Sequence, residues 1–363
     1  MKRFWNIYEK IYDLDNLRTA HRMARKDKAL YKEVQMVNSN PDYYLKQIQI
    51  MLKEKKYRIT AKNYTVSVIR DRTKNRELRK LNYYPHRIIQ RAIMLQIEKA
   101  FMKVFTEFTC ASIRWRWWKQ VRKLIDKYMK DKEWTAYCLK IDIQKFYPSV
   151  NHKILKNLLR KKFKDKDLLN LLDMIIDSFP WKRWLPIWSY LSQFLANYYL
   201  AFFDHHMKEK IKCKYVIRYM DDIIVLWRTA KRLRYVYRRM KAYLNGRLDL
   251  KIKDNRQIFP TDKRWIDFVW YRYFHWYKLL RKRTCKRLKK KIIKLNQTKK
   301  MKFRQRCSMN SYIGWLKRCD AYRLKQKRII PLKDRLIDYY KNVLKGHRRY
   351  EKNLLKNLYL IKA

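Results

Sequence analysis

Residues 215–226 read YVIRYMDDIIVL, and this stretch limits the possible fold more than any other part of the chain. Runs of β-branched and aromatic residues flank Asp221 and Asp222, which predicts a hairpin with both carboxylates at its tip. Adjacent carboxylates between apolar strands repel each other, at a cost in free energy, unless a positive charge lies between them. The stretch therefore predicts a tip that holds a metal ion. The alternative is a plain turn, because Asp is a common turn residue.

A second predicted strand also ends in an acidic residue. Residues 135–143, TAYCLKIDI, are apolar and β-branched and lead to Asp142. If this strand joins the hairpin in one antiparallel sheet, Asp142 lies beside Asp221. Phosphoryl transfer uses such carboxylates to hold two divalent cations about 3.5–4 Å apart. Magnesium suits the site because it binds one or two carboxylates together with substrate phosphates.

The charge of the chain predicts a polyanionic partner. Lys and Arg number 93 against 31 Asp and Glu, a net charge of +62 over 363 residues. Such an excess repels itself unless a polyanion neutralises it, and nucleic acid is the first candidate. The alternative is that these residues only coat a surface. The apolar fraction of 47% is enough for two or three domains with a core.

The periodicity along the chain predicts an α+β fold class, with helices before, between and after a group of strands. A basic loop, TKNRELRK, is expected at 73–80. We expect helices within 1–60 and at 86–105, 151–163 and 192–211, a basic helical tail beyond about 278, and strands at 63–71, 135–143, 215–227 and 264–274.

Targeting and metal motifs are not evident in the sequence. The six cysteines have no CxxC spacing, which predicts neither a zinc site nor a disulfide framework. We find no signal peptide and no apolar run of about 18 residues, so no membrane is expected as a partner. We expect a cytoplasmic, reducing location.

Together with KIDIQKFYPSV (140–150), the YMDD tip closely resembles the reverse transcriptases, and the similarity covers most of the chain. The resemblance implies a right-hand polymerase that copies RNA into DNA, inside a bacterial cell or for a phage. It implies an N-terminal helical extension over 1–60, fingers and palm with an antiparallel palm sheet over 61–280, and an all-helical basic thumb over 281–363.

The resemblance also implies roles for single residues. Asp142 and Asp221 match the metal-binding aspartates and Asp222 the second acid of the tip, with two Mg²⁺ ions as cofactor and Mn²⁺ as a substitute. Tyr147 matches the aromatic ring that packs under the sugar and excludes a 2′-hydroxyl, although Phe146 has an equal claim from sequence alone. Ile143 is expected in the same substrate site.

The segment TKNRELRK resembles the part of the fingers whose basic side chains contact the nucleotide triphosphate. Lys74, Arg76 and Arg79 would serve there. Each is alternatively a solvated surface charge, because the chain is so basic. The implied substrates are deoxynucleoside triphosphates, a template RNA and the cDNA.

The segment LPIWSYLSQFLANYYL (185–200) resembles the reverse transcriptases of diversity-generating retroelements, because Ser192-Gln193 stands where most reverse transcriptases have Ser-Pro. Those enzymes copy a template-repeat RNA with errors at adenines, and the family implies a small basic helical-bundle accessory protein. Residues 11–28 and 311–324 resemble the same subgroup. Ile187 and Gln193 would lie near the templating base, unless Gln193 only caps or solvates a helix start. Group II intron and retron enzymes fit less well.

Tryptophan stands at several positions where this family has glycine. Average usage of about 7% predicts about 25 glycines, and the chain has 3 beside 13 tryptophans. The affected positions are Trp115, Trp117, Trp181, Trp184, Trp188, Trp265 and Trp270. We hypothesise that the source reads UGA as glycine. The alternatives are genuine stacking platforms for bases and a non-catalytic RNA-binding scaffold with a strained polymerase fold.

Overall fold

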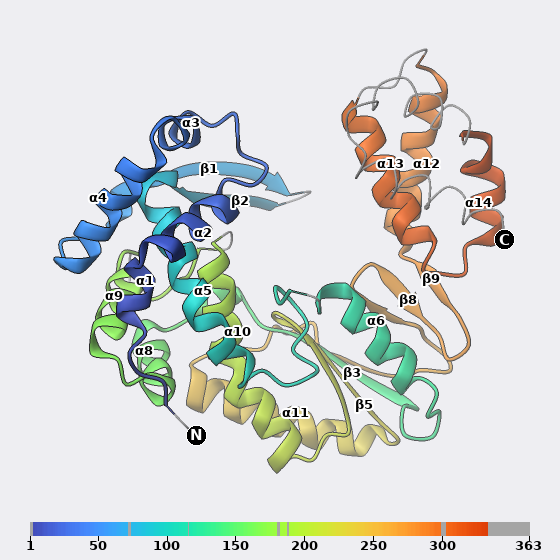
Figure 1. Cartoon of the computed structure of the whole chain (residues 1–363). Coiled ribbons are helices and arrows are strands. Elements are labelled where there is room, and N and C mark those ends of the chain that lie inside the picture. Colours follow the sequence, from blue (N-terminus) through green and yellow to red (C-terminus); the bar gives the residue numbers. More distant parts are fainter. Residues whose placement is uncertain are drawn as a thin grey trace. The chain divides into compact units, whose positions relative to one another are not determined.

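The computed structural model describes residues 3–71, 74–114, 116–179, 182–186, 189–298 and 303–332. They fall into two compact units, Met1–Leu124 with Tyr137–Ile258, and Ile125–Ala136 with Phe259–Ala363. The boundaries lie inside α6 (Trp117–Tyr128), directly before β3 (Tyr137–Asp142) and inside β6 (Gln257–Pro260). Each unit is described separately below (Figure 1).

The first unit contains most of the predicted helices. Side chains at their N-caps accept backbone N–H groups that have no partner within the helix, such as Asp13 before α2 and Ser189 before α10. The helices are α1 (Tyr8–Tyr12), α2 (Leu14–Ala24), α3 (Lys32–Ser39), α4 (Pro41–Lys53), α5 (Ile88–Met102), α7 (Phe146–Ser149), α8 (His152–Lys162), α9 (Lys166–Asp177), α10 (Tyr190–His205) and α11 (Ala230–Leu248).

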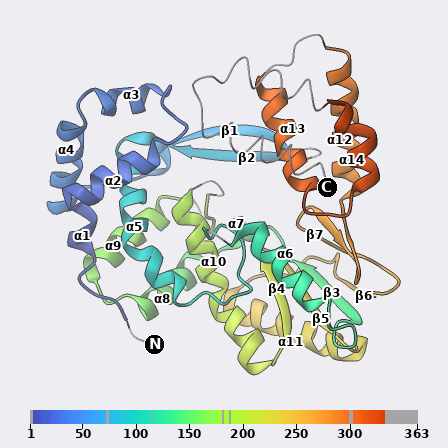
Figure 2. The same ribbon diagram turned by 45° about the vertical axis from the view of Figure 1, so that its right-hand side comes forward.

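The predicted basic loop at 73–80 is wrong, because residues 74–80 belong to a strand. β2 (Lys74–Leu81) pairs antiparallel with β1 (Tyr64–Asp71), with Val66 opposite Arg79 (Figure 2). The hydrogen bonds offered by β1 outweigh the low intrinsic strand preference of a charged segment, since β-propensity depends strongly on context.

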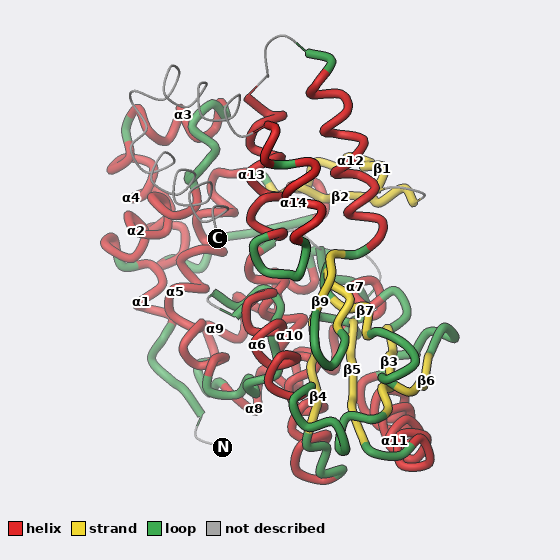
Figure 3. Tube along the Cα trace, turned by 90° about the vertical axis from the view of Figure 1, so that its right-hand side faces the viewer, coloured by secondary structure: helices red, strands yellow, loops and turns green. Residues whose placement is uncertain are grey.

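The central sheet has four strands in the order β4-β5-β3-β6, of which β4, β5 and β3 belong wholly to this unit. β4 (Tyr215–Tyr219) and β3 (Tyr137–Asp142) both pair antiparallel with β5 (Asp222–Trp227). Residues Ile223–Leu226 of β5 are all buried, as expected of a strand covered on both faces. α11 packs on β3 and β5, which Figure 3 shows in yellow beside the red helix.

Two long apolar helices, α5 and α10, pack against each other in this unit. α10 packs against α5, α8 and α11, and 12 of its 16 residues are buried. Figure 1 shows α5 and α10 side by side. A helix that is apolar around its whole circumference is a core helix, so α10 forms a rigid base for the strand ends described below.

The second unit combines a small sheet with helices. Its antiparallel meander consists of β7 (Ile266–Phe268), β8 (Tyr271–Tyr273) and β9 (Lys278–Leu280). It continues into α12 (Lys282–Asn296), α13 (Phe303–Leu316) and α14 (Tyr322–Arg328). Leu288, Ile292 and Ile313 are buried within this unit. None of the helices in the described part of the chain is long and apolar enough to cross a membrane.

Candidate active site

The three aspartates meet at one end of the central sheet. Asp142 is the last residue of β3, and Asp222, the first residue of β5, is its register partner. Tyr219 of β4 is also opposite Asp222, so Met220 and Asp221 form a two-residue hairpin loop. The predicted tip is therefore a tight turn, and it lies beside the end of β3.

Backbone contacts fix the loop on both sides of Asp221. The Ile143 N–H donates to the Asp221 carbonyl at 3.3 Å, and the Arg218 guanidinium donates through Nη1 to the Met220 carbonyl at 3.1 Å. Met220 has a φ of 56°, a left-handed conformation that is uncommon for a residue with a long side chain. The loop is thus held in a conformation that Met220 does not prefer.

The carboxyl of Asp221 is strongly perturbed. Burial, followed by the charges of Asp222 and Asp142, raises its pKa to about 7, and a hydrogen bond with Asp142 acts in the same direction. Without a cation, Asp221 thus keeps a proton up to about neutral pH, since neighbouring carboxylates resist a further negative charge.

This donor set fits a divalent cation. The carboxylates are hard oxygen ligands in a partly desolvated place, and a cation would replace the proton of Asp221. No group of three or more His, Cys, Asp or Glu side chains close enough to hold a metal ion occurs among the residues that the structure describes. Asp142 and Asp221 share a hydrogen bond, so these two carboxyls would be the ligands, and water and substrate phosphates would take the other coordination positions, which is typical of magnesium.

A lysine that the sequence analysis missed lies against the site. Lys253 Nζ is 3.3 Å from Asp142 Oδ2, and both side chains are partly exposed. The contact arises because the segment after α11 runs beside the end of β3. There the Lys253 N–H donates to the Asp142 carbonyl at 2.9 Å, and Ile143 bridges Ile252. One lysine among so many gives no sequence signal of this role.

Tyr147 lies at the tip, whereas Phe146 belongs to the core. The Tyr147 hydroxyl is 3.8 Å from the Met220 sulfur, and burial raises the pKa of this phenol. Phe146 is only 2% exposed. Of the two aromatic residues, Tyr147 is therefore the one that contacts the hairpin tip.

The other predicted substrate residues lie on separate elements. The Ile143 side chain is buried, so only its backbone contacts the tip. Gln193 lies in the first turn of α10 and is half-buried. Arg79 pairs with Glu77 at 2.6 Å and stacks on the Trp184 ring at 4.6 Å. Lys74 and Arg76 lie in β2, but their side chains, like Ile187, are outside the described parts of the structure.

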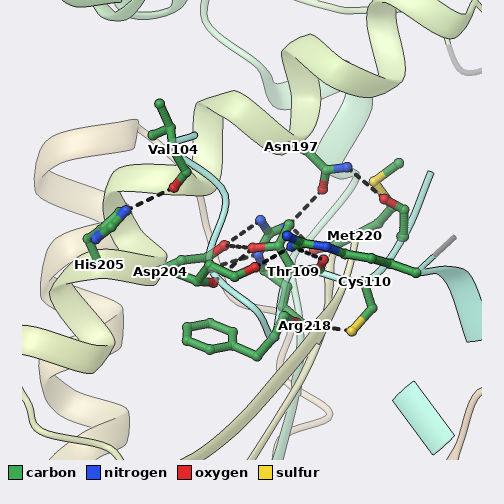
Figure 4. Close-up of polar contacts among 12 residues, drawn as sticks. Val104, Thr109, Cys110, Asn197, Asp204, His205, Arg218 and Met220 are labelled. Carbon is green, nitrogen blue, oxygen red and sulfur yellow. Dashed lines mark hydrogen bonds and ion pairs between the residues drawn. The ribbon is translucent and has the colours of Figure 1, made fainter. Parts of the chain in front are cut away.

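Behind the tip is a buried ionic network (Figure 4). Arg218 and Asp204 are 0% and 1% exposed. They form two parallel hydrogen bonds, from Nε to Oδ1 at 2.7 Å and from Nη2 to Oδ2 at 2.6 Å. Arg218 also donates to Asn197 at 3.1 Å, and Thr109 donates to Asp204 at 2.7 Å. An arginine inside the apolar strand YVIRY was a sequence signal for such a partner, since Arg is almost never buried unpaired.

Comparison with known proteins identifies the family of the chain. Residues 70–260 match the family described as reverse transcriptase (RNA-dependent DNA polymerase). The chain belongs to the reverse transcriptase family. The match confirms the expected enzyme class, an RNA-directed DNA polymerase.

The structure of the chain is similar to solved telomerase structures. Telomerase from Candida albicans, in complex with the TWJ fragment of telomeric RNA, matches with a TM-score of 0.51 and 11% identity over 85% of this chain and 61% of that chain. Apo telomerase from Candida tropicalis matches with a TM-score of 0.46 and 11% identity over 66% of this chain and 52% of that chain. The chain thus covers between half and two thirds of the telomerase chains. No curated protein sequence matches it.

Proposed function

We propose that the chain copies RNA into DNA by two-metal nucleotidyl transfer, with Asp142 and Asp221 as metal ligands and Asp222 supporting them. The observation that carries the proposal is the meeting of these residues, Asp142 opposite Asp222 in the sheet and Asp221 with a pKa raised to about 7 by burial and by both neighbours. Neighbouring carboxylates repel each other and lower the stability of a fold, so their presence indicates a function such as metal binding.

The reaction joins a primer 3′-hydroxyl to the α-phosphorus of a deoxynucleotide and breaks the bond to the β-phosphate, releasing pyrophosphate. When bound, two Mg²⁺ ions would stabilise the attacking and leaving oxygens, with Mn²⁺ as a possible substitute. Asp142 and Asp221 would hold those ions, and Tyr147 would pack under the sugar and exclude a 2′-hydroxyl. Ile143 positions Asp221 through its N–H group, and Lys74, Arg76, Arg79 and Gln193 contribute to the nucleotide site.

Primer extension on an RNA template tests this proposal. The chain is compared with Asp221→Asn, which keeps the side-chain shape but removes the negative charge. Extension by the unchanged chain and its loss in the variant are expected. Extension that survives the change would refute the metal assignment, and binding of RNA without extension by either protein would favour a non-catalytic scaffold.

We further propose that the enzyme belongs to the diversity-generating retroelement type and copies a template-repeat RNA with errors at adenines. Ser192-Gln193 at the start of α10 supports this assignment. Sequencing the cDNA product is the test, because errors concentrated at template adenines are expected of this type, whereas a uniform error spectrum would favour a group II intron-like or retron enzyme.

In this proposal the chain is organised as an N-terminal extension (1–60), fingers and palm (61–280) and a basic thumb (281–363). The partners are template RNA, cDNA, deoxynucleoside triphosphates and a small basic helical-bundle protein. The net charge of +62 supports a nucleic-acid partner.

A further inference from the structure

We propose that Arg218 is a positioning residue, which holds the metal-binding tip in place through the Met220 carbonyl. The proposal rests on the proposed function of Asp221 as a metal ligand. It gives the buried Arg218–Asp204 pair a role in metal binding in addition to any role in the stability of the fold.

The contacts of Arg218 point in two directions. Nε and Nη2 are fixed by Asp204 of α10 at 2.7 and 2.6 Å, and Nη1 bridges Asn197 and the Met220 carbonyl, both at 3.1 Å. A planar guanidinium held at one edge has no freedom at the other edge. The position of the Met220 carbonyl is thereby tied to the rigid helix α10.

The backbone of Arg218 is fixed as well. Its N–H donates to the Phe108 carbonyl and its carbonyl accepts from the Cys110 N–H, both at 3.0 Å. Thr109, between these two residues, donates its hydroxyl to Asp204. The segment beside β4 thus completes the network (Figure 4), and Arg218 has neither backbone nor side-chain freedom.

The tip needs such support because its geometry is unfavourable. Met220 is the first residue of a two-residue hairpin loop, and its φ of 56° is the conformation for which glycine is favoured at that position. The hydrogen bond from Arg218 compensates for this conformation. The Ile143 N–H holds the next carbonyl, that of Asp221. Residues that orient a ligand of a metal typically change metal affinity or activity about 10- to 100-fold when replaced.

The test separates positioning from folding. The double variant Arg218→Met with Asp204→Leu replaces the ion pair by apolar side chains of similar size, which buried sites often tolerate without loss of stability. The matched control is Arg160→Met with Asp173→Leu, which removes another bidentate pair, at 3.3 and 2.5 Å between α8 and α9, from the same unit. Mn²⁺ binding without nucleic acid is measured by electron paramagnetic resonance, together with the Mg²⁺ dependence of primer extension.

We expect the Arg218/Asp204 variant to fold, to bind Mn²⁺ about tenfold or more weakly and to need correspondingly more Mg²⁺, while the Arg160/Asp173 control matches the unchanged chain. Unchanged metal binding in the folded variant overturns the proposal. If the double variant does not fold, Arg218→Lys replaces it, because one ammonium cannot reach both Asp204 oxygens and the Met220 carbonyl. Unchanged binding there also overturns the proposal.

Failure of the proposed function gives a different pattern. Asp221→Asn is measured alongside, and unweakened Mn²⁺ binding in this variant refutes the metal assignment itself. Weakened binding in Asp221→Asn but not in the Arg218/Asp204 variant refutes only the positioning role. The binding measurement stays informative even if the unchanged chain extends no primer.

A separate observation carries a second inference, which concerns the tryptophans. Three of them have positive φ, with 30° at Trp117, 95° at Trp184 and 72° at Trp270. Positive φ is a genuine outlier for bulky residues. Trp265 does not share this feature, and Trp115, Trp181 and Trp188 lie outside the parts of the chain that the structure describes.

The turn at Trp270 is the clearest case. Phe268 pairs with Tyr271, so Val269 and Trp270 form a two-residue hairpin loop. Their φ values are 35° and 72°, as in a type I′ turn, which strongly prefers Asn-Gly or Gly-Gly. Trp184 is similarly constrained, because its N–H donates to the Val150 carbonyl at 3.0 Å.

We infer that the protein made in its own cell carries glycine at Trp184 and Trp270, in agreement with UGA read as glycine. Tryptic digestion of protein isolated from those cells releases the peptide 265–272, which is bounded by arginines. Glycine at 270 is expected in its mass spectrum. Trp315 lies inside α13, so tryptophan is expected in the peptide 307–317 of the same digest. Tryptophan at 270 overturns the inference.

Discussion

Replacing Asp221 by Asn tests the electrostatics of the site without any assay of DNA synthesis. Asn has the shape of a protonated Asp and can donate a hydrogen bond to Asp142. It cannot ionise, so it removes the repulsion by Asp222 and Asp142. In the absence of divalent cations we expect the variant to be more stable than the unchanged chain.

The size of the effect follows from the pKa, which is raised from 3.8 to about 7 in the folded protein. A raised pKa means that the unfolded chain releases this proton first, so the contribution to stability is lost as pH rises from about 4 through about 7. The full shift corresponds to about 4 kcal/mol. The stability gained by Asn should therefore grow from under about 1 kcal/mol at pH 4 to about 2 kcal/mol at pH 5.5 and about 4 kcal/mol at pH 8.

Urea unfolding with EDTA at these three pH values measures the difference in unfolding free energy. Asp254→Asn, which removes an exposed carboxylate, is the matched control and should show little change at any pH. Mg²⁺ should then reduce the advantage of Asp221→Asn, because only the unchanged chain gains stability from binding the ion.

Two results would refute the reasoning. An Asp221→Asn variant whose stability difference does not depend on pH would mean that Asp221 ionises normally and that the three aspartates do not interact. A variant that is less stable at pH 8 without metal would mean that the charged carboxylate has a stabilising partner within the protein.

Three further predictions concern the neighbours of the aspartates and the charge of the chain. Lys253→Met should strengthen Mn²⁺ binding up to about fivefold, because the lysine competes for Asp142 in a partly exposed pair; weaker binding in a titration would contradict this. Tyr147→Ala should raise ribonucleotide incorporation at least about tenfold in competition assays with both sugars, whereas an unchanged ratio would assign that role elsewhere. RNA binding should weaken about 10³- to 10⁵-fold between about 50 and 200 mM salt if six to ten phosphates are contacted, and a flat response in filter binding would exclude a phosphate-dominated interface.

The predicted strands and helices with strong periodicity were found, and the failure at β2 shows the limit of such predictions. The composition of a segment as charged as TKNRELRK predicts a loop. It became a strand because β1 offered a complete set of hydrogen bonds, with Val66 opposite Arg79. Which partner a strand has depends on residues that are distant in the chain, and local composition does not contain that information.

The sequence by itself determined the hairpin tip, because two runs of β-formers around Asp221 and Asp222 are a local pattern with few alternatives. The tertiary structure alone decided which residues support the tip. Arg218 reaches the Met220 carbonyl because Asp204 on α10 fixes its other edge, and Lys253 reaches Asp142 because the chain after α11 runs beside β3. Both contacts depend on the register between distant segments, which is set by how the whole unit packs.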